Sequence, residues 1–361
     1  MAQKVTRLID VAQHAGLSVA TVSRHLNGHI QLPVDTVARI EGAIHELGYR
    51  PNPYARSLSR GRSDTIGLVI PDIANPYFAL LASAVERAAG PHGLAVVLCV
   101  TLNQSEREHE YLQRLGRNHL DGLIFLTNHA ADEALAKAIN EASRRVVILD
   151  EDVKKARGPK IFGDNEQGGY LAGRHLLEAG HRRLAFIGGP EHLMSTQARL
   201  AGFRRALGEA PSAELTAHYF GDYSVENGRR SAGALLRAGE EITAVFATSD
   251  EIAIGALEVF AARNVRIPDD LSVIGFDGIA PFHLFNPPLT CIRQPVEELG
   301  RRAVELLASG LNGGRMRAGA QRLPVELVVR ESVSAPRNGQ GSGAKMILNA
   351  EDANRERMES K

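Results

Sequence analysis

The sequence predicts a small all-α head joined to an α/β body that contains two doubly wound parallel-sheet lobes. Apolar residues recur at helical spacing in the first 48 residues, whereas short apolar runs alternate with helical segments after residue 64. Such alternation is typical of parallel sheets that helices cover on both faces. With 361 residues and 44% hydrophobic content, the chain is long enough for two or three domains.

The stretch 8–27 has the pattern of two short helices joined by a glycine turn. Gly16 allows a left-handed turn at little steric cost, and Ser18 is placed to cap the second helix. Because Val22 and Leu26 face inward at i, i+4, their neighbours point outward. The pattern indicates a helix-turn-helix, whose second helix enters the major groove of DNA; an amphipathic helix pair in a larger core is the alternative.

A third helix is expected over residues 34–47, between Pro33 and the helix-ending Gly48, and the first helix is expected to begin near Arg7. Residues 1–63 carry eight Lys and Arg against four Asp and Glu, although the whole chain has no net charge. A basic head on a slightly acidic body is the asymmetry expected of a module that contacts phosphates.

The body is expected to contain seven strand-like runs, at 65–72, 94–100, 121–126, 145–150, 183–189, 243–250 and 271–278. Helices fit between them, for example at 77–89, 105–117, 165–179 and 250–262. A break in the pattern near 153–163 favours two sheets over one. The strands end in polar or turn residues, and ligands of open α/β sheets bind beyond those carboxyl ends.

Several classes of protein are not expected from this sequence. Cys99 and Cys291 lie in apolar runs and are better explained as small buried hydrophobes than as a disulfide. No apolar run has the length of a membrane span, and the first ten residues do not form a signal peptide, which predicts a cytoplasmic protein. The motifs GxSxG, HExxH and CxxC and a dinucleotide fingerprint are missing, so no enzyme, cofactor or metal site is expected.

The helix-turn-helix stretch resembles the DNA-binding signature of the lactose-repressor (LacI) family, since DVA, AG, S, TVSR and LN stand at that family's spacing. The resemblance continues through PNPYARSL and on to about residue 332. It implies a body of the periplasmic-binding-protein type, in which the chain crosses three times between a lobe nearer DNA and a far lobe. The end of the chain lacks the apolar heptad of a tetramer, which favours a homodimer.

The expected domain limits follow from the composition and the resemblance together. They are a head at 1–48, a hinge helix and linker at 49–63, a body at 64–336, and a disordered tail at 337–361. Within the body, the resemblance implies an N-lobe at 64–162 and 293–322 and a C-lobe at 163–292.

The resemblance also implies which residues contact DNA. Val19 and Ala20 occupy the principal base-reading positions, where they can only pack on thymine methyls or fit the shape of the groove. Arg24 is the candidate for a bidentate guanine contact, with a phosphate contact as the alternative. Leu58 holds the position of the hinge leucine that wedges into the minor groove, with a flexible tether as the alternative. The other candidates are Ser18, Thr21, Ser23, Asn27, Tyr49 and Arg56, of which Thr21, Ser23, Asn27 and Tyr49 are expected on phosphates.

Candidate effector residues lie where the strands of the body end. Asp277 ends the run SVIGFD, where a carboxylate can accept from two sugar hydroxyls, and Arg199 can donate to ring or carboxyl oxygens. Tyr77 and Phe78 can pack on the apolar face of a ring. The remaining candidates are Asp150, Ser195, Tyr223, Ser249 and Asp250. For Ser195 and Asp250 the alternative is a cap on the next helix.

We therefore expect a dimeric transcription repressor that binds a near-palindromic operator under the control of a small molecule in the cleft, a sugar or sugar acid. A purine is the alternative effector. A sugar-binding transport protein is a second alternative, although it would need a signal peptide and would have no use for residues 1–63. A sugar-handling enzyme would need an acid–base pair, which the sequence does not offer.

Overall fold

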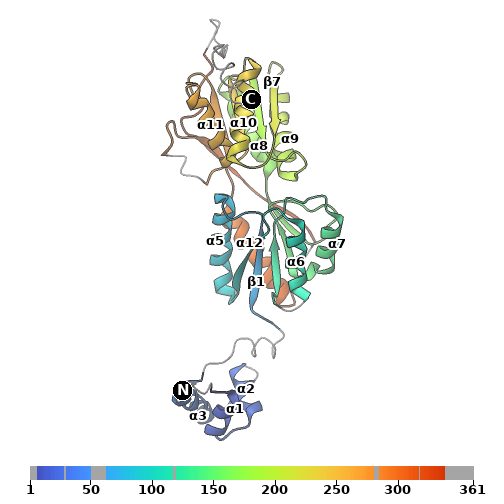
Figure 1. The fold of residues 1–361 in the computed structure, drawn as a ribbon, viewed down its shortest axis with the longest axis vertical. Helices are drawn as coiled ribbons and strands as arrows, with labels where there is room; N and C mark the ends of the chain where they lie inside the picture. Colours follow the sequence, from blue (N-terminus) through green and yellow to red (C-terminus); the bar gives the residue numbers. More distant parts are fainter. Residues whose placement is uncertain are drawn as a thin grey trace, which may run out of the picture.

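The computed structural model describes residues 6–27, 30–49, 62–116, 119–279, 284–316 and 318–337. Figure 1 shows a helical head, coloured blue, and a body of two lobes, each built around a sheet with helices beside it. The predicted fold class is confirmed, since the head is all-α and each lobe is α/β.

Three helices form the head: α1 (Leu8–His14), α2 (Val19–Leu26) and α3 (Val34–Leu47). Gly16 adopts the expected left-handed conformation between α1 and α2, with a φ of 63°. Arg39 of α3 donates hydrogen bonds to the carbonyl oxygens of Ala15 and Gly16, which ties the third helix to this turn. The head has a small core of its own, made of Val11, Ala12, Ala15, Val22, Ile40 and Ala43.

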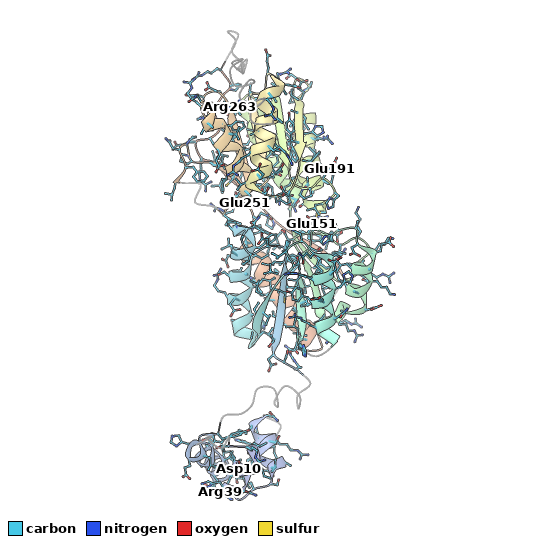
Figure 2. The ribbon with its side chains drawn as sticks, in the orientation of Figure 1. Asp10, Arg39, Glu151, Glu191, Glu251 and Arg263 are labelled. Carbon is cyan, nitrogen blue, oxygen red and sulfur yellow. The ribbon has the colours of Figure 1, made fainter. Side chains whose placement is uncertain are left out.

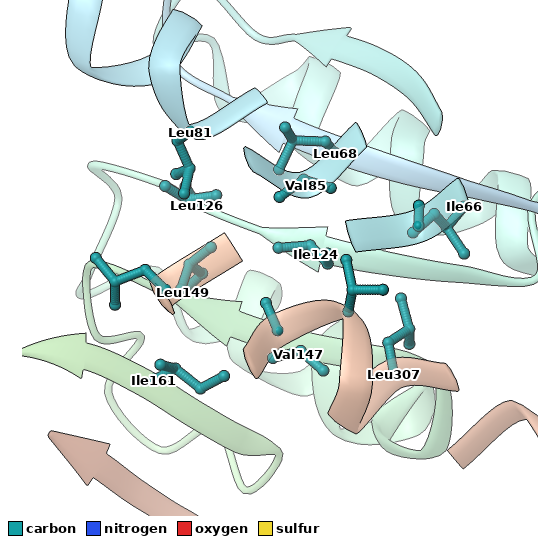
Figure 3. Packing of buried hydrophobic residues seen from close by; sticks show 14 of the residues in the cluster. Ile66, Leu68, Leu81, Val85, Ile124, Leu126, Val147, Leu149, Ile161 and Leu307 are labelled. Carbon is teal, nitrogen blue, oxygen red and sulfur yellow. The ribbon is translucent and has the colours of Figure 1, made fainter. Parts of the chain in front are cut away.

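The first lobe contains a six-stranded parallel sheet in the order β11-β5-β4-β3-β1-β2. Its strands are β1 (Thr65–Ile70), β2 (Ala95–Val100), β3 (Gly122–Phe125), β4 (Val146–Leu149), β5 (Pro159–Gly163) and β11 (Gly319–Leu323). Helices α5 (Pro76–Ala89) and α12 (Val296–Leu311) cover one face, and α6 (Ser105–Gly116) and α7 (Glu133–Glu141) cover the other. Figure 3 shows side chains of α5 and α12, among them Leu81 and Leu307, packed on the buried strand residues.

The second lobe repeats this plan with the order β12-β10-β9-β8-β6-β7. Its strands are β6 (Arg183–Gly188), β7 (Glu214–Phe220), β8 (Ala244–Ala247), β9 (Ser272–Asp277), β10 (Thr290–Arg293) and β12 (Glu326–Val328). Helices α8 (Asn165–Glu178) and α9 (Met194–Gly208) lie on one face, and α10 (Val225–Ala238) and α11 (Asp250–Ala262) lie on the other. The sheet is not wholly parallel as predicted, because the edge strand β12 runs antiparallel to β10.

All seven expected runs form strands, but the sequence missed five others. The stretch 153–163, predicted as a break, ends in β5, which pairs with both β4 and β11. The chain passes between the lobes three times, after β5, after β10 and between β11 and β12. Cys99 and Cys291 are buried and free, as expected.

Some expectations fall on residues that the structure does not describe. Arg56, Leu58 and the stretch 338–361 lie outside the described residues. Arg337, the first residue of the predicted tail, lies within 3.5 Å of Asp270 and thereby contacts the second lobe. No helix in the described part of the chain combines the length and apolar character needed to cross a membrane.

Candidate functional site

Helix α2 presents one face of the head to its surroundings. Val22 is fully buried, whereas Val19 is 40% exposed and Ala20 and Arg24 are also exposed. Ser18 begins the helix as predicted, because its Oγ accepts a hydrogen bond from the backbone N–H of Thr21 at 3.1 Å. The expected outward face therefore exists.

The other DNA candidates in the described head are less exposed. Thr21, Ser23 and Asn27 are half-buried along α2. Tyr49 packs against the core of the head, and its backbone N–H donates to the carbonyl oxygen of Ile44 just after α3. These positions leave polar atoms of α2 at the edge of the exposed face.

A cavity of about 210 Å³ lies between the two lobes, where strands of both sheets end. Its lining comes from both lobes and from the second crossover. The lining residues are Pro71, Asp72, Asn75, Tyr77, Phe78, Asn103, Asn128, Asp150, Glu151, Pro190, Ser195, Arg199, Asp222, Tyr223, Ser224, Ser249, Asp277 and Gln294. Strand ends of open α/β sheets are where ligands bind, and this cavity follows that rule in both lobes.

Arg199 projects from α9 into the base of this cavity and is held on several sides. Its Nε donates to the Oδ1 atom of Asn165 at 2.8 Å, and its Nη1 donates to the carbonyl oxygen of Thr248. The guanidinium carbon lies 3.7 Å from the centre of the Phe276 ring, a cation–π contact. Its Nη2 lies 3.9 Å from the carboxylate of Asp277, and both residues line the cavity.

Asp277 and Asp150 occupy equivalent places at the strand ends of the two lobes. Both have left-handed backbones, with φ values of 85° and 69°, which non-glycine residues adopt rarely. Gln294 donates to Asp277 through Nε2 at 2.8 Å, and Tyr77 donates to Asp150 through its hydroxyl. Burial raises the pKa of Asp150 to about 6 and raises that of Asp277 above its ordinary value.

Glu151 joins the two lobes. It follows β4 in the first lobe, and its carboxylate accepts from the backbone N–H of Ser195 at the start of α9, at 3.2 Å. Figure 2 labels Glu151 where the lobes meet. Burial raises its pKa to about 7. A second link joins His192 to the carbonyl oxygen of Asn128 at 3.3 Å.

The cavity has a strongly acidic lining. Its carboxylates are Asp72, Asp150, Glu151, Asp222 and Asp277, and Arg199 is the one cationic side chain among the described lining residues. The described residues contain no group of three or more His, Cys, Asp or Glu that could hold a metal ion. The arrangement therefore suits hydrogen bonding to a neutral polar ligand better than binding of an anion.

Eight of the nine predicted effector residues line this cavity together. Asp250 is the exception: its carboxylate accepts from the backbone N–H groups of Gly278 and Ile279, so it holds the turn after β9. Ser249 and Ser195 line the cavity, and Ser249 also caps α11 through the backbone N–H of Ile252. The sequence missed Glu151, although it stands beside Asp150 at a predicted strand end, and it missed further polar residues that carried no local signal: Asn75, Asn103, Asn128, Asp222, Ser224 and Gln294.

The exposed recognition helix and the shared cavity define a DNA-binding regulator with a small-molecule site between two lobes. The family model of bacterial regulatory proteins of the lacI family matches residues 7–52, and that of a periplasmic binding protein-like domain matches residues 174–333. The chain belongs to the lacI family of bacterial regulatory proteins and is an effector-controlled, DNA-binding repressor.

Relatives match nearly the whole chain. The ribose operon repressor of Halalkalibacterium halodurans is 36% identical over 94% of this chain and 100% of its own length. The transcriptional regulator DegA of Bacillus subtilis is 34% identical over 91% of this chain and 98% of its own. The lac repressor dimer bound to operator and the anti-inducer ONPF is 30% identical, with a TM-score of 0.82 over 92% of this chain and all of that chain. These relatives are transcriptional regulators, not enzymes.

Proposed function

We propose that this repressor is a homodimer whose affinity for a near-palindromic operator is controlled by a neutral sugar in the cleft. The observation that carries the proposal is that residues of both lobes line one small cavity in a chain with an exposed recognition helix. A ligand there contacts both lobes, so its affinity depends on how the lobes are arranged. Solved relatives hold cellobiose and, in a regulator from Enterococcus faecium, ribose.

The proposed ligand class follows from charge and size. The lining has one arginine against five carboxyl groups, of which burial keeps Asp150 and Glu151 partly protonated. An anionic sugar acid, one of the two expected classes, therefore fits less well than a neutral polyol. The cavity of about 210 Å³ is smaller than the roughly 300–1,000 Å³ typical of drug-sized ligands. Phe78 and Tyr223 supply apolar ring faces, while Asp277 and Arg199 supply an acceptor and a donor.

The proposed DNA contacts belong to α2 and the segments that follow it. Arg24 reads guanine, Val19 and Ala20 pack on thymine methyls, and polar atoms of Ser18, Thr21, Ser23, Asn27 and Tyr49 hold phosphates. Leu58 of the hinge is proposed to wedge into the minor groove, and Arg56 is proposed to contact DNA. The domain limits given above are part of the same proposal. A protein that acts on an operator works in the cytoplasm, beside the chromosome.

Operator binding is tested by gel shift across a range of salt concentrations. We expect a steep linear fall of the logarithm of affinity with the logarithm of salt, together with preference for one palindromic sequence.

Arg24→Ala is expected to weaken operator binding by about 1–3 kcal/mol and to relax preference at one base position. Arg263→Ala, at the outer end of the second lobe (Figure 2), is the matched control and leaves binding unchanged. No DNA binding at low salt would refute the proposal, and a uniform loss would make Arg24 a phosphate contact.

The ligand class is tested by thermal shift with neutral sugars, sugar acids and nucleobases. A neutral monosaccharide is expected to raise the melting temperature by mass action, because it binds only the folded protein. Asp277→Asn is expected to remove that rise. The amide keeps one acceptor oxygen, which Gln294 already uses, and turns the other oxygen into an NH2 donor, so a sugar hydroxyl loses its acceptor. A rise with nucleobases alone would assign the site to a purine instead.

A further inference from the structure

A second cavity lies in the first lobe, at the edge of its sheet opposite the cleft. It has a volume of about 610 Å³. Its lining residues are Arg144, Arg157, Gly158, Pro159, Gly310, Gly313, Gly314, Arg315, Met316 and Ala318. Three of these are arginines and none of the described lining residues is acidic, which reverses the charge of the cleft.

Each arginine comes from a segment that leads into a different strand. Arg144 lies just before β4, Arg157 just before β5, and Arg315 shortly before β11. These strands are neighbours in the order β11-β5-β4 and run parallel, so their starting ends share one edge of the sheet. Since adjacent strands are about 4.8 Å apart, the fold brings three exposed arginine residues to one hollow.

The three guanidinium groups are not used to hold the fold. Within the described ranges, no carboxylate or carbonyl oxygen pairs with the side chain of Arg144, Arg157 or Arg315. The neighbouring Arg145, by contrast, donates to the carbonyl oxygen of Leu115 at 3.0 Å. The C-terminal end of α12 favours nearby cations, but none of the three groups donates to its last described carbonyls. Three like charges gathered without a carboxylate partner among the described residues attract an anion, because the partial charge of one helix end does not balance them.

The wall between the arginines is made of small residues. A Cβ on Gly310 would lie 2.1 Å from the sulfur of Met316 and 3.3 Å from the carbonyl oxygen of Arg144, so a larger residue there would displace the Met316 side chain. Gly313 has a φ of 83°, a backbone conformation that favours glycine. Small residues therefore lie between the three arginines that line the hollow.

We propose that this cavity is a second ligand site, distinct from the effector cleft, and that it binds a small phosphorylated compound. The planar guanidinium fork matches phosphate oxygens, and three such groups can surround a doubly charged phosphate. A concave site favours a small molecule over the convex backbone of a duplex. The site also adjoins the linker, because Arg62 donates to Oδ1 of Asn312, next to Gly313, at 3.0 Å.

The test uses the full chain and inorganic pyrophosphate as the probe, at fixed ionic strength. Pyrophosphate is expected to raise the melting temperature of the parent protein in a saturable way. The triple variant R144Q/R157Q/R315Q is expected to bind it at least tenfold more weakly. R204Q/R237Q/R263Q, which removes the same charge from exposed positions of the second lobe, is the matched control and is expected to bind it as the parent does.

Three results would overturn the proposal. One is the absence of any stabilisation by pyrophosphate in the parent, and another is equal stabilisation of the parent and the R144Q/R157Q/R315Q variant. The third concerns operator binding without pyrophosphate. If that variant loses operator affinity and its salt slope becomes shallower, the arginines contact DNA phosphates instead. The melting temperatures without probe show that each variant is folded, so a loss of binding is not a loss of structure.

Discussion

Arg199 shows how one side chain connects stability with ligand binding. It is only 4% exposed, and Asn165, Thr248 and Phe276 surround it. A buried cation of this kind is costly unless its partners are in place, and those partners come from three different elements of the second lobe. The same contacts fix its guanidinium beside Asp277 in the lining of the cavity.

Arg199→Leu is expected to lower the free energy of unfolding by roughly 3–5 kcal/mol, because it leaves buried Asp277 without a cation. Urea titration followed by circular dichroism measures the loss. Arg205→Leu, on the same helix, removes an exposed pair with Glu166 and is expected to cost no more than about 1 kcal/mol. Equal losses in the two variants would show that Arg199 has no special structural role.

Glu151→Gln is expected to remove a pH-dependent contribution to stability. Burial raises the pKa of Glu151 to about 7, from an ordinary 4.5, so between these values the folded protein holds a proton that the unfolded chain releases. The contribution is present below about pH 4.5 and is lost as the pH rises through about 7. As the pH rises over this range, the free energy of unfolding of the parent is expected to fall by roughly 1–3 kcal/mol relative to that of the variant, as measured by urea titration.

The prediction concerns the difference in the free energy of unfolding between the parent and Glu151→Gln at each pH. The free energy of the parent alone is not informative, because other groups titrate in the same range. Burial lowers the pKa of His181 to about 4, which makes stability rise with pH instead. Glu191→Gln, which removes an exposed carboxylate of the second lobe, is the control. A pH-independent difference for Glu151→Gln, or the same pH-dependent difference in both variants, would contradict the prediction.

At the scale of elements, the crossing of α8 and α9 decides where Arg199 stands. A Cβ on Gly169 of α8 would lie 2.0 Å from the carbonyl oxygen of Arg199, and a Cβ on Gly202 of α9 would lie 1.8 Å from that of Glu166. The two helices therefore touch backbone to backbone. Any side chain at the crossing must push α9 away from α8 and move Arg199 with it.

Gly202→Ala is expected to destabilise the protein by about 1–3 kcal/mol or more and to weaken ligand binding, because the helices must separate. Gly208→Ala at the end of α9 is the matched control, since a Cβ there meets nothing within 4 Å. It is expected to be neutral or to stabilise by up to about 1 kcal/mol. Urea titration and ligand titration are the measurements, and equal effects of the two substitutions would argue against a tight crossing.

At the scale of the whole molecule, the lobes are connected by three chain crossings and by contacts across the cleft. Glu151 accepts from Ser195, and His192 meets Asn128. Glu151, Ser195 and Asn128 also line the cavity, so a bound ligand affects the residues that make both contacts between the lobes. The arrangement of the lobes and the occupancy of the cavity are therefore linked.

Linkage predicts a reciprocal effect between the two ligands of the repressor. The factor by which the bound sugar changes operator affinity is expected to equal the factor by which operator changes sugar affinity. Fluorescence titrations of labelled operator with and without sugar give the first factor, and calorimetric titration of sugar with and without operator gives the second. Sugar affinity that is unchanged by operator would show that the cleft does not control DNA binding.

Local sequence determined the head, most strands and the majority of the cleft residues. The left-handed backbone of Gly16 and Gly48 and the helix cap made by Ser18 depend only on residues nearby in the sequence. A window of a few residues therefore predicts their roles. Buried parallel strands are similarly visible as apolar runs. Strand ends then indicated Asp150 and Asp277, because open sheets present those ends to ligands.

The tertiary structure decided what depends on partners distant in sequence. β11 has mostly exposed residues and no apolar period, so its place beside β5 comes from pairing alone. Asp250 does not line the cleft, because its carboxylate accepts a hydrogen bond from the backbone N–H of Gly278, 28 residues away. Glu151 became an inter-lobe contact through a residue 44 positions further on. The arginine-lined cavity also depends on residues distant in sequence, since the starting ends of β4, β5 and β11 come together only when the sheet forms.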